Sequence, residues 1–208
     1  RTTVPSSLKR NPDYIYVGGL SLPSKMPGFS YSLPAGECVT GSKLRQVKGS
    51  TCSHCYAYKR GNYRFNNVQT ALYRRLDSLT DLDAWRDAMI RLLPLAVTEP
   101  VFRWHDSGDI QSVAHLQAIA DEATALPTIR FWLPTREYAM LKTYLESGGA
   151  IPANLTVRMS APMVGKTIPV RPGVASQGVQ TSSVGAGVGS VCEAKSRENH
   201  CGPCRACW

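Results

Sequence analysis

The sequence predicts an α/β fold, a partial (incomplete) parallel β/α barrel followed by a C-terminal cysteine-rich module. Strand-like and helix-like segments alternate over residues 101–161, a pattern typical of parallel sheets with right-handed crossovers. Apolar residues make up 43% of the 208 residues and charged residues 19%, which excludes a disordered or fibrous chain. The strand-like segments are too few for a closed eight-stranded barrel, so we expect an open one.

The elements follow from periodicity, caps and breakers. Residues 14–17 are an apolar run that Gly18 and Gly19 close, and we expect a strand there. Helical spacing of apolar residues predicts helices from residue 66 to 79 and from 81 to 93, the second capped by Thr80. The following segments are predicted as strands over 101–104, 128–133 and 155–161, with helices over 112–123 and 137–146. His115 is expected on the exposed side of its helix.

Two parts are expected along the chain. Residues 1–165 would form the partial barrel, which includes an N-terminal loop with three cysteines. Residues 166–208 would form a Gly/Ser-rich loop and a C-terminal module with four cysteines, and no clear element is predicted over 162–191. No apolar run approaches the roughly 20 residues of a membrane span, and no signal-peptide core is visible. We therefore expect no membrane association and a cytoplasmic location.

The chain is basic. Lys and Arg number 24 against 15 Asp and Glu, for a formal net charge of +9. This balance is compatible with nucleic acid as a partner, but the excess is spread along the sequence, as in an ordinary basic protein.

The seven cysteines fall into two groups and carry the strongest chemical signal. The first group is Cys38, Cys52 and Cys55, and the second is Cys192, Cys201, Cys204 and Cys207. Two successive C-x-x-C steps in the second group are hard to explain as disulfides and indicate metal ligands in a reducing compartment. Its four thiolates would hold a [4Fe–4S] cluster or zinc. The first group would hold a [4Fe–4S] cluster with one iron open, or a structural zinc completed by His54 or a distant cysteine.

Polar residues follow the predicted strands, where parallel α/β sheets place their sites. After the first of the three strands come His105, Asp106, Ser107, Gly108 and Asp109, and after the second comes Arg136. Each residue alone is explained equally well as a helix cap, a turn residue or a hydrogen-bonded structural histidine. Their convergence at one edge favours a functional site.

Several sequence blocks carry a family resemblance. The segments CSHCYA from Cys52, FRWHDSGD from Phe102, FWLPTRE from Phe131 and the closing CGPCRACW resemble a phage- and plasmid-encoded protein family that shares these blocks. The likeness covers most of the chain from Cys38 onward. More loosely, the cysteine loop is similar to that of radical SAM enzymes, which use a partial β/α barrel.

The radical SAM resemblance implies roles for particular residues. Cys38, Cys52 and Cys55 would hold a [4Fe–4S] cluster that binds SAM, with Tyr56 as the neighbouring aromatic residue. The segment Ser107–Gly108–Asp109 stands where these enzymes have Gly-Gly-Glu, so Asp109 would contact SAM. His105, Asp106 and Arg136 would orient the substrate or move protons. Two features depart from the pattern, because Cys38 and Cys52 are far apart in sequence and Tyr56 follows the last cysteine instead of preceding it.

Three functional hypotheses follow. The first is an iron–sulfur protein with radical-SAM-like chemistry on an unidentified small-molecule or macromolecular substrate, in the cytoplasm of an infected or plasmid-bearing bacterial host. The second is an iron–sulfur redox or sensing protein that does not use SAM but needs an electron donor. The third is a zinc-stapled nucleic-acid-binding module, which the basic charge favours.

Overall fold

The fold is organised around one parallel sheet. The computed structural model describes residues 3–58, 60–169, 174, 177–187 and 189–208. Its five strands are β1 (Ser30–Tyr31), β2 (Val101–Trp104), β3 (Arg130–Thr135), β4 (Leu155–Ser160) and β5 (Gln180–Ser182). They pair in chain order, β1-β2-β3-β4-β5, and every pairing is parallel. The sheet is not closed, because no pairing joins β1 to β5 within the described residues.

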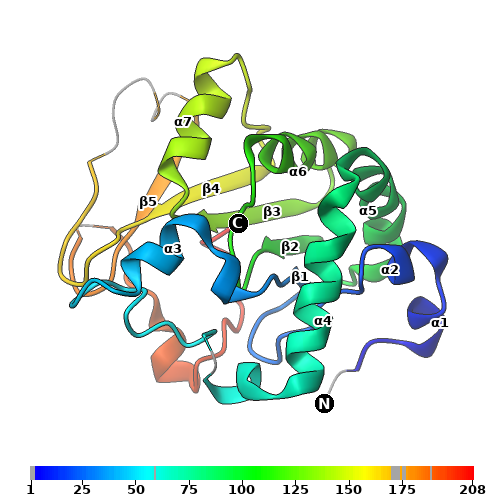
Figure 1. The fold of residues 1–208 in the computed structure, drawn as a ribbon, viewed down its shortest axis with the longest axis horizontal. Helices are drawn as coiled ribbons and strands as arrows, with labels where there is room; N and C mark the ends of the chain where they lie inside the picture. Colours follow the sequence, from blue (N-terminus) through cyan, green and yellow to red (C-terminus); the bar gives the residue numbers. More distant parts are fainter. Residues whose placement is uncertain (1–2, 59, 170–173, 175–176, 188) are drawn as a thin grey trace.

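Three long helices connect the strands. They are α5 (Leu82–Ala96) before β2, α6 (Val113–Ala125) between β2 and β3, and α7 (Tyr138–Glu146) between β3 and β4. Neighbouring crossovers also neighbour each other in space, since α5 contacts α6 and α6 contacts α7 (Figure 1). This confirms an open α/β fold with a parallel sheet, whereas the barrel itself stays a prediction.

The remaining elements are short, except for α4 (Asn66–Asp77). Among the described residues, short helices are α1 (Ser6–Lys9), α2 (Pro12–Tyr16) and α3 (Val39–Leu44). The 3-10 turns in the same part of the chain, η1 to η4, cover Ala35–Glu37, Gly61–Arg64, Ser78–Thr80 and Glu193–Arg197.

The hydrophobic core lies between the sheet and the crossover helices. Alternate residues of β2 and β3 point to this side, among them Phe102, Trp104 and Phe131, all fully buried. Trp104 stacks on Phe131 at 6.3 Å between ring centroids and packs against Trp85 of α5 at 5.8 Å. Leu92 of α5 and further apolar side chains of α6 complete the layer. Burying such aromatic side chains supplies the largest hydrophobic contribution per residue.

Most predicted elements are confirmed, and three details are wrong. Residues 14–17 are not a strand, because Asn11 caps a helix there by accepting hydrogen bonds from the backbone N–H groups of Asp13 and Tyr14. Helix α5 is capped by Asp81, not Thr80, through the N–H of Ala84 at 3.0 Å. The long segment without a predicted element contains β5. Part of that segment, at residues 170–173, 175–176 and 188, lies outside the described residues.

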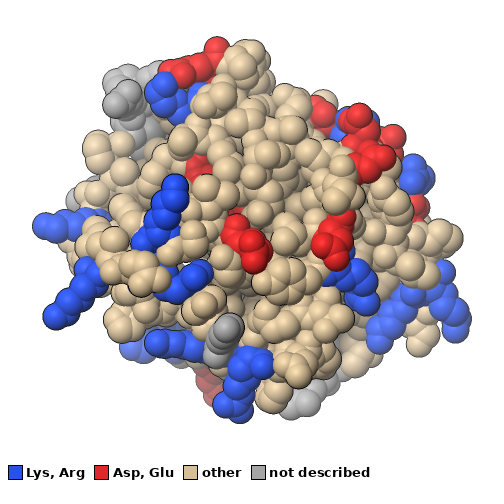
Figure 2. Space-filling model, in the orientation of Figure 1, with Lys and Arg blue, Asp and Glu red and all other residues tan. Residues whose placement is uncertain are grey.

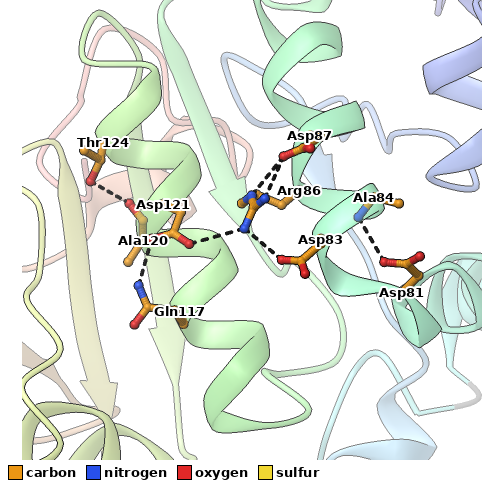
Figure 3. A network of polar contacts seen from close by, with 9 residues as sticks. All are labelled: Asp81, Asp83, Ala84, Arg86, Asp87, Gln117, Ala120, Asp121 and Thr124. Carbon is orange, nitrogen blue, oxygen red and sulfur yellow. Dashed lines mark hydrogen bonds and ion pairs between the residues drawn. The ribbon is translucent and has the colours of Figure 1, made fainter.

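A surface network ties α5 to α6. Arg86 of α5 contacts Asp83 and Asp87 on its own helix, each at 2.9 Å, and reaches Asp121 of α6 at 3.7 Å (Figure 3). These groups are partly exposed, so the pairs contribute little to stability. Through Asp121 they join the two helices at the surface of the molecule.

The C-terminal segment covers the sheet face opposite the helices. Arg103 and Trp132 lie side by side on that face, with the guanidinium 4.3 Å from the ring centroid. Trp208 packs edge-on against Trp132 at 5.3 Å, and its indole N–H donates to the carbonyl of Phe102 at 2.9 Å. Arg158 of β4 donates to the carbonyl of Ala206 at 2.6 Å. The chain end accordingly lies over the sheet in Figure 1.

Candidate functional site

The loops that follow β2 and β3 meet at the carboxyl edge of the sheet. Asp109 is buried, and its carboxyl accepts hydrogen bonds from the Thr135 hydroxyl at 2.7 Å, the Arg136 N–H at 2.9 Å and the Ile110 N–H at 2.9 Å. Burial raises the pKa of Asp109 to about 6, against the opposing effect of these hydrogen bonds. Both carboxylate oxygens are therefore occupied inside the protein.

The cysteine loop is fastened to the same edge at two points. Glu137, after β3, accepts hydrogen bonds from the N–H of Thr40 at 2.8 Å and from its hydroxyl at 2.6 Å. Thr51 donates through its N–H to the carbonyl of Pro162, after β4, at 2.8 Å. A buried carboxyl that takes two hydrogen bonds from one residue is a strong local constraint. These contacts place residues 38–55 over the carboxyl ends of β3 and β4.

Cys38, Cys52 and Cys55 belong to this loop, and we call them the cysteine trio. Cys38 is the N-cap residue of α3, and Gly41 lies one turn further on. A Cβ on Gly41 would lie 2.9 Å from the Cys38 Cβ, 3.6 Å from the Cys38 Sγ and 3.7 Å from the Cys52 Sγ. The two sulfur atoms therefore face the same small space, which a side chain at position 41 would fill.

Burial controls the protonation of Cys38 and Cys52. It raises the pKa of Cys38, and nearby acidic groups, Asp109 first among them, raise it further. It also raises the pKa of Cys52, although the positive charge of Arg136 acts in the opposite direction. As free thiols, Cys38 and Cys52 are neutral at pH 7, and binding a metal would replace the proton. Within the described part of the chain, no three His, Cys, Asp or Glu side chains are already arranged around a single metal position.

The second group, which we call the cysteine quartet, lies in the C-terminal segment. Cys192 and Cys204 are exposed, whereas Cys201 and Cys207 are partly buried. Burial raises the pKa values of Cys201 and Cys207, while Arg103 and Arg158 respectively lower them. The backbone N–H of Cys201 donates to the carbonyl of Lys25 at 3.0 Å, which joins the module to the N-terminal part of the chain.

His105, a predicted catalytic residue, is buried. Its Nδ1 lies 2.8 Å from the carbonyl oxygen of Tyr31, which assigns the proton to that nitrogen. Burial lowers the pKa of His105 to about 4, so the ring is neutral at pH 7. His115 is also buried and its ring lies 5.5 Å from that of His105, so its predicted exposure is wrong. Helix α6 turns His115 toward Trp85 of α5 at 5.2 Å.

Asp106, also predicted as catalytic, connects three segments. Its carboxyl accepts hydrogen bonds from Ser30 at 2.8 Å, from Ser32, and from the Tyr63 hydroxyl at 3.0 Å. Its backbone carbonyl accepts a hydrogen bond from the hydroxyl of Tyr56. Asp106 thus fixes two tyrosines that follow the cysteine trio. Arg136, the third predicted catalytic residue, lies near Cys52 and contributes its N–H to Asp109.

Ser107 and Gly108 join the β2 loop to the chain after β1. The Ser107 hydroxyl donates to the carbonyl of Leu33 at 2.7 Å, and the Leu33 N–H donates back to the Ser107 carbonyl at 2.8 Å. Gly108 has φ +81°, and a Cβ there would lie 2.5 Å from the Leu33 Cβ. Only glycine fits this position without a shift. The predicted cofactor contacts Ser107, Gly108 and Asp109 thus have internal structural partners, whereas Tyr56 has an exposed ring.

The sequence reasoning missed the residues that hold the trio in place. Glu137 carries a sequence signal, since it directly follows a strand and Arg136. Gly41 carries a weaker one, three residues after a cysteine. Thr40 shows its role only through its contact with Glu137, 97 positions away.

Comparison with known proteins gives one match. Searches of curated proteins and of solved structures found no match. No helix in the described ranges is both long and apolar enough to cross a membrane. Residues 6–168, which contain the sheet strands β1 to β4 and the trio but not the quartet, match the family model described as gene product 88. The chain therefore belongs to the gene product 88 family, a phage-type protein family.

Proposed function

We propose that this protein is an iron–sulfur protein whose cysteine trio holds a [4Fe–4S] cluster at the carboxyl edge of the sheet. The observation that supports it is the space at Gly41, which the sulfur atoms of Cys38 and Cys52 both face. The loop around this space is fastened to the ends of two strands, by Glu137 and by Thr51.

The donor set fits such a cluster. Three thiols without a carboxylate or histidine among them are the ligands of soft metal centres and iron–sulfur clusters. A cluster binds each thiolate to a different iron, so its cysteines stay apart, whereas a single ion would need them around one point. A bound cluster would supply one-electron redox chemistry and one iron without a protein ligand.

The surrounding residues have separate tasks in this proposal. Gly41 leaves the space open, Glu137 and Thr51 hold the loop, and the guanidinium of Arg136 offsets negative charge near Cys52. Asp109 has both oxygens bonded internally, so a SAM molecule would need other polar contacts. This favours, as a second candidate, an iron–sulfur redox or sensing protein that does not use SAM and takes electrons from a separate donor.

The quartet would hold a second cluster or a zinc ion. Burial raises the pKa values of Cys201 and Cys207, and the positive charges of Arg103 and Arg158 act in the opposite direction, as charge that would stabilise metal-bound thiolates does. The family match ends before the quartet, so the two centres are testable as separate units.

The test is metal analysis on protein purified without oxygen. Iron, acid-labile sulfide and zinc per chain would be measured for the wild type, for C55A, and for H54A as the neighbouring control. We expect C55A to lose the iron of the trio and H54A to keep it. Unchanged iron in C55A would refute the assignment, and zinc without iron would refute the cluster.

Electron paramagnetic resonance of the reduced protein separates the two candidates. A spectral change on adding SAM would support radical-SAM-like chemistry. A cluster spectrum that ignores SAM would support the redox or sensing protein.

A further inference from the structure

Basic and aromatic side chains gather on one surface next to the cysteine trio. We define this basic–aromatic surface by Arg45, Tyr56, Arg60, Arg64, Phe65 and Tyr73. Tyr56, Phe65 and Tyr73 are 58%, 48% and 42% exposed, although they are large and mostly apolar. Figure 2 shows Lys and Arg side chains mainly at the left, lower and right parts of this face, while Asp and Glu side chains lie near its middle, at its top and at its upper right. Exposed rings among cations indicate a binding surface.

Three segments that are distant in sequence build this surface. Arg45 follows α3, and its guanidinium lies 3.6 Å from the ring centroid of Tyr58. Tyr73 of α4 donates to Glu37 at 3.0 Å, and both Tyr58 and Tyr73 come within 3.9 Å of a Cβ placed on Gly36. These contacts join Arg45 to Tyr58 and join α4 to Glu37, which precedes α3. The sequence has no run of basic residues, so the basic residues of this surface come from separate segments.

The rings are held in place before any ligand arrives. The hydroxyl of Tyr56 is bonded to the carbonyl of Asp106, so the exposed part of Tyr56 is its ring. Tyr63 packs edge-on against Tyr56 at 5.9 Å, and its own hydroxyl is bonded to Asp106. Arg64 lies over Phe65 at 5.2 Å. Anchored rings lose little conformational entropy when a flat group stacks on them.

The positive charge of the surface is uncompensated. Arg60 and Arg64 are exposed, as are Arg74, Lys43 and Lys48, and none of the five forms an ion pair with another described residue, although the Arg74 guanidinium donates to the carbonyl of Gly18. The acidic groups nearby are Glu37, which Tyr73 contacts, and Asp77 at the end of α4. Cations without carboxylate partners are available to phosphates.

We propose that the basic–aromatic surface binds a single-stranded polynucleotide. Arg60 and Arg64 would contact phosphates, and bases would stack on Tyr56 and Phe65. Stacking requires unpaired bases, because the faces of paired bases are covered within a duplex. The surface continues from Cys55 to Tyr56, so a bound strand lies beside the trio. Binding needs no metal and does not depend on the proposed cluster.

The experiment is fluorescence anisotropy with a labelled oligo(dT) of about 20 nucleotides, titrated with the full chain at several salt concentrations. We expect binding that weakens with salt. The double variant R60Q/R64Q should lower the salt slope by about 1.4, or roughly 0.7 per lost phosphate contact. F65A should weaken binding roughly five- to 150-fold without changing the salt slope, because it removes stacking and no charge. The Phe65 side chain makes no cap bond to α4, so helix formation is preserved.

Matched controls lie on other faces. R91Q changes an exposed arginine of α5, and L95A an exposed apolar residue of the same helix, and both should bind like the wild type. Protein treated with a chelator to remove metal should also bind normally, which separates this proposal from the cluster. Three outcomes would each overturn the proposal. The first is equal affinity for a base-free polyanion such as heparin, with no effect of F65A. The others are a preference for duplex DNA, or binding to anionic vesicles alone. An oligo(rU) of equal length shows whether the sugar contributes to binding. If neither oligo(dT) nor oligo(rU) binds more tightly than a duplex, the proposal is also overturned.

Discussion

The contact between Glu137 and Thr40 is the clearest place to test how the cysteine loop is held. Glu137 is buried and takes both a backbone and a side-chain hydrogen bond from Thr40, at 2.8 and 2.6 Å. A hydrogen bond to a charged group contributes about 1.5–3 kcal/mol. E137A removes both bonds and leaves a cavity, so we expect a loss of roughly 3–5 kcal/mol in unfolding free energy.

A conservative variant separates shape from charge. In E137Q the amide oxygen still accepts from the Thr40 N–H, and the amide N–H group can donate to the Thr40 hydroxyl. The loss should be about 1–2 kcal/mol, the difference between charge-assisted and neutral bonds. The control is E146Q at the exposed end of α7, where the pair with Lys142 is worth about 0.5 kcal/mol at most.

Two measurements check this reasoning. Urea unfolding gives the free energies, and amide hydrogen exchange reports on residues 38–55. We expect faster exchange in this loop for E137A than for E137Q, and little change in α6. The helix cap is not involved, because Glu137 makes no side-chain cap bond to α7. A loss below about 1 kcal/mol in E137A, with unchanged exchange in the loop, would refute the anchoring role.

Two further predictions concern buried positions. G41A should add about 1 kcal/mol of helix propensity but place a Cβ 2.9 Å from that of Cys38, so we expect no net gain in urea unfolding and reduced iron in the trio, with S42A as the control. More iron in G41A, or a full gain of about 1 kcal/mol in its unfolding free energy, would contradict the proposal that the space at Gly41 must stay open. Glu122 of α6 is fully buried, both of its oxygens lack a partner among the described residues, and burial raises its pKa well above 4.5, while Arg86 opposes this. Folding thus favours its protonated form, and stability is lost as the pH rises from about 4.5 through the raised pKa. E122L should gain about 1–3 kcal/mol at pH 7 and less at pH 5; a larger gain at pH 5 would contradict this.

The sequence predicted the elements whose signals are local. Helices α4 to α7 and strands β2 to β4 were found because apolar periodicity and glycine stops act within a few residues. Ser112 was correctly identified as a cap, and it accepts from the N–H of His115 at 3.0 Å. Strand β1 was missed because two residues carry no periodicity, and α2 was taken for a strand because its apolar run obscured the Asn11–Pro12 start signal.

The sequence by itself determined the α/β class, the parallel sheet and the two cysteine groups, since each follows from residue type and spacing along the chain. The tertiary structure alone decided what the polar residues do. Asp109, Ser107 and Gly108 bond to neighbouring loops, His105 and His115 are enclosed by the core, and Glu137 holds Thr40 across the sheet edge. The basic–aromatic surface likewise combines segments that are distant in sequence, as the contact between Tyr73 and Glu37 shows. Such contacts join residues far apart in sequence, and their partners are set by how the strands order and the helices pack, which no local pattern encodes.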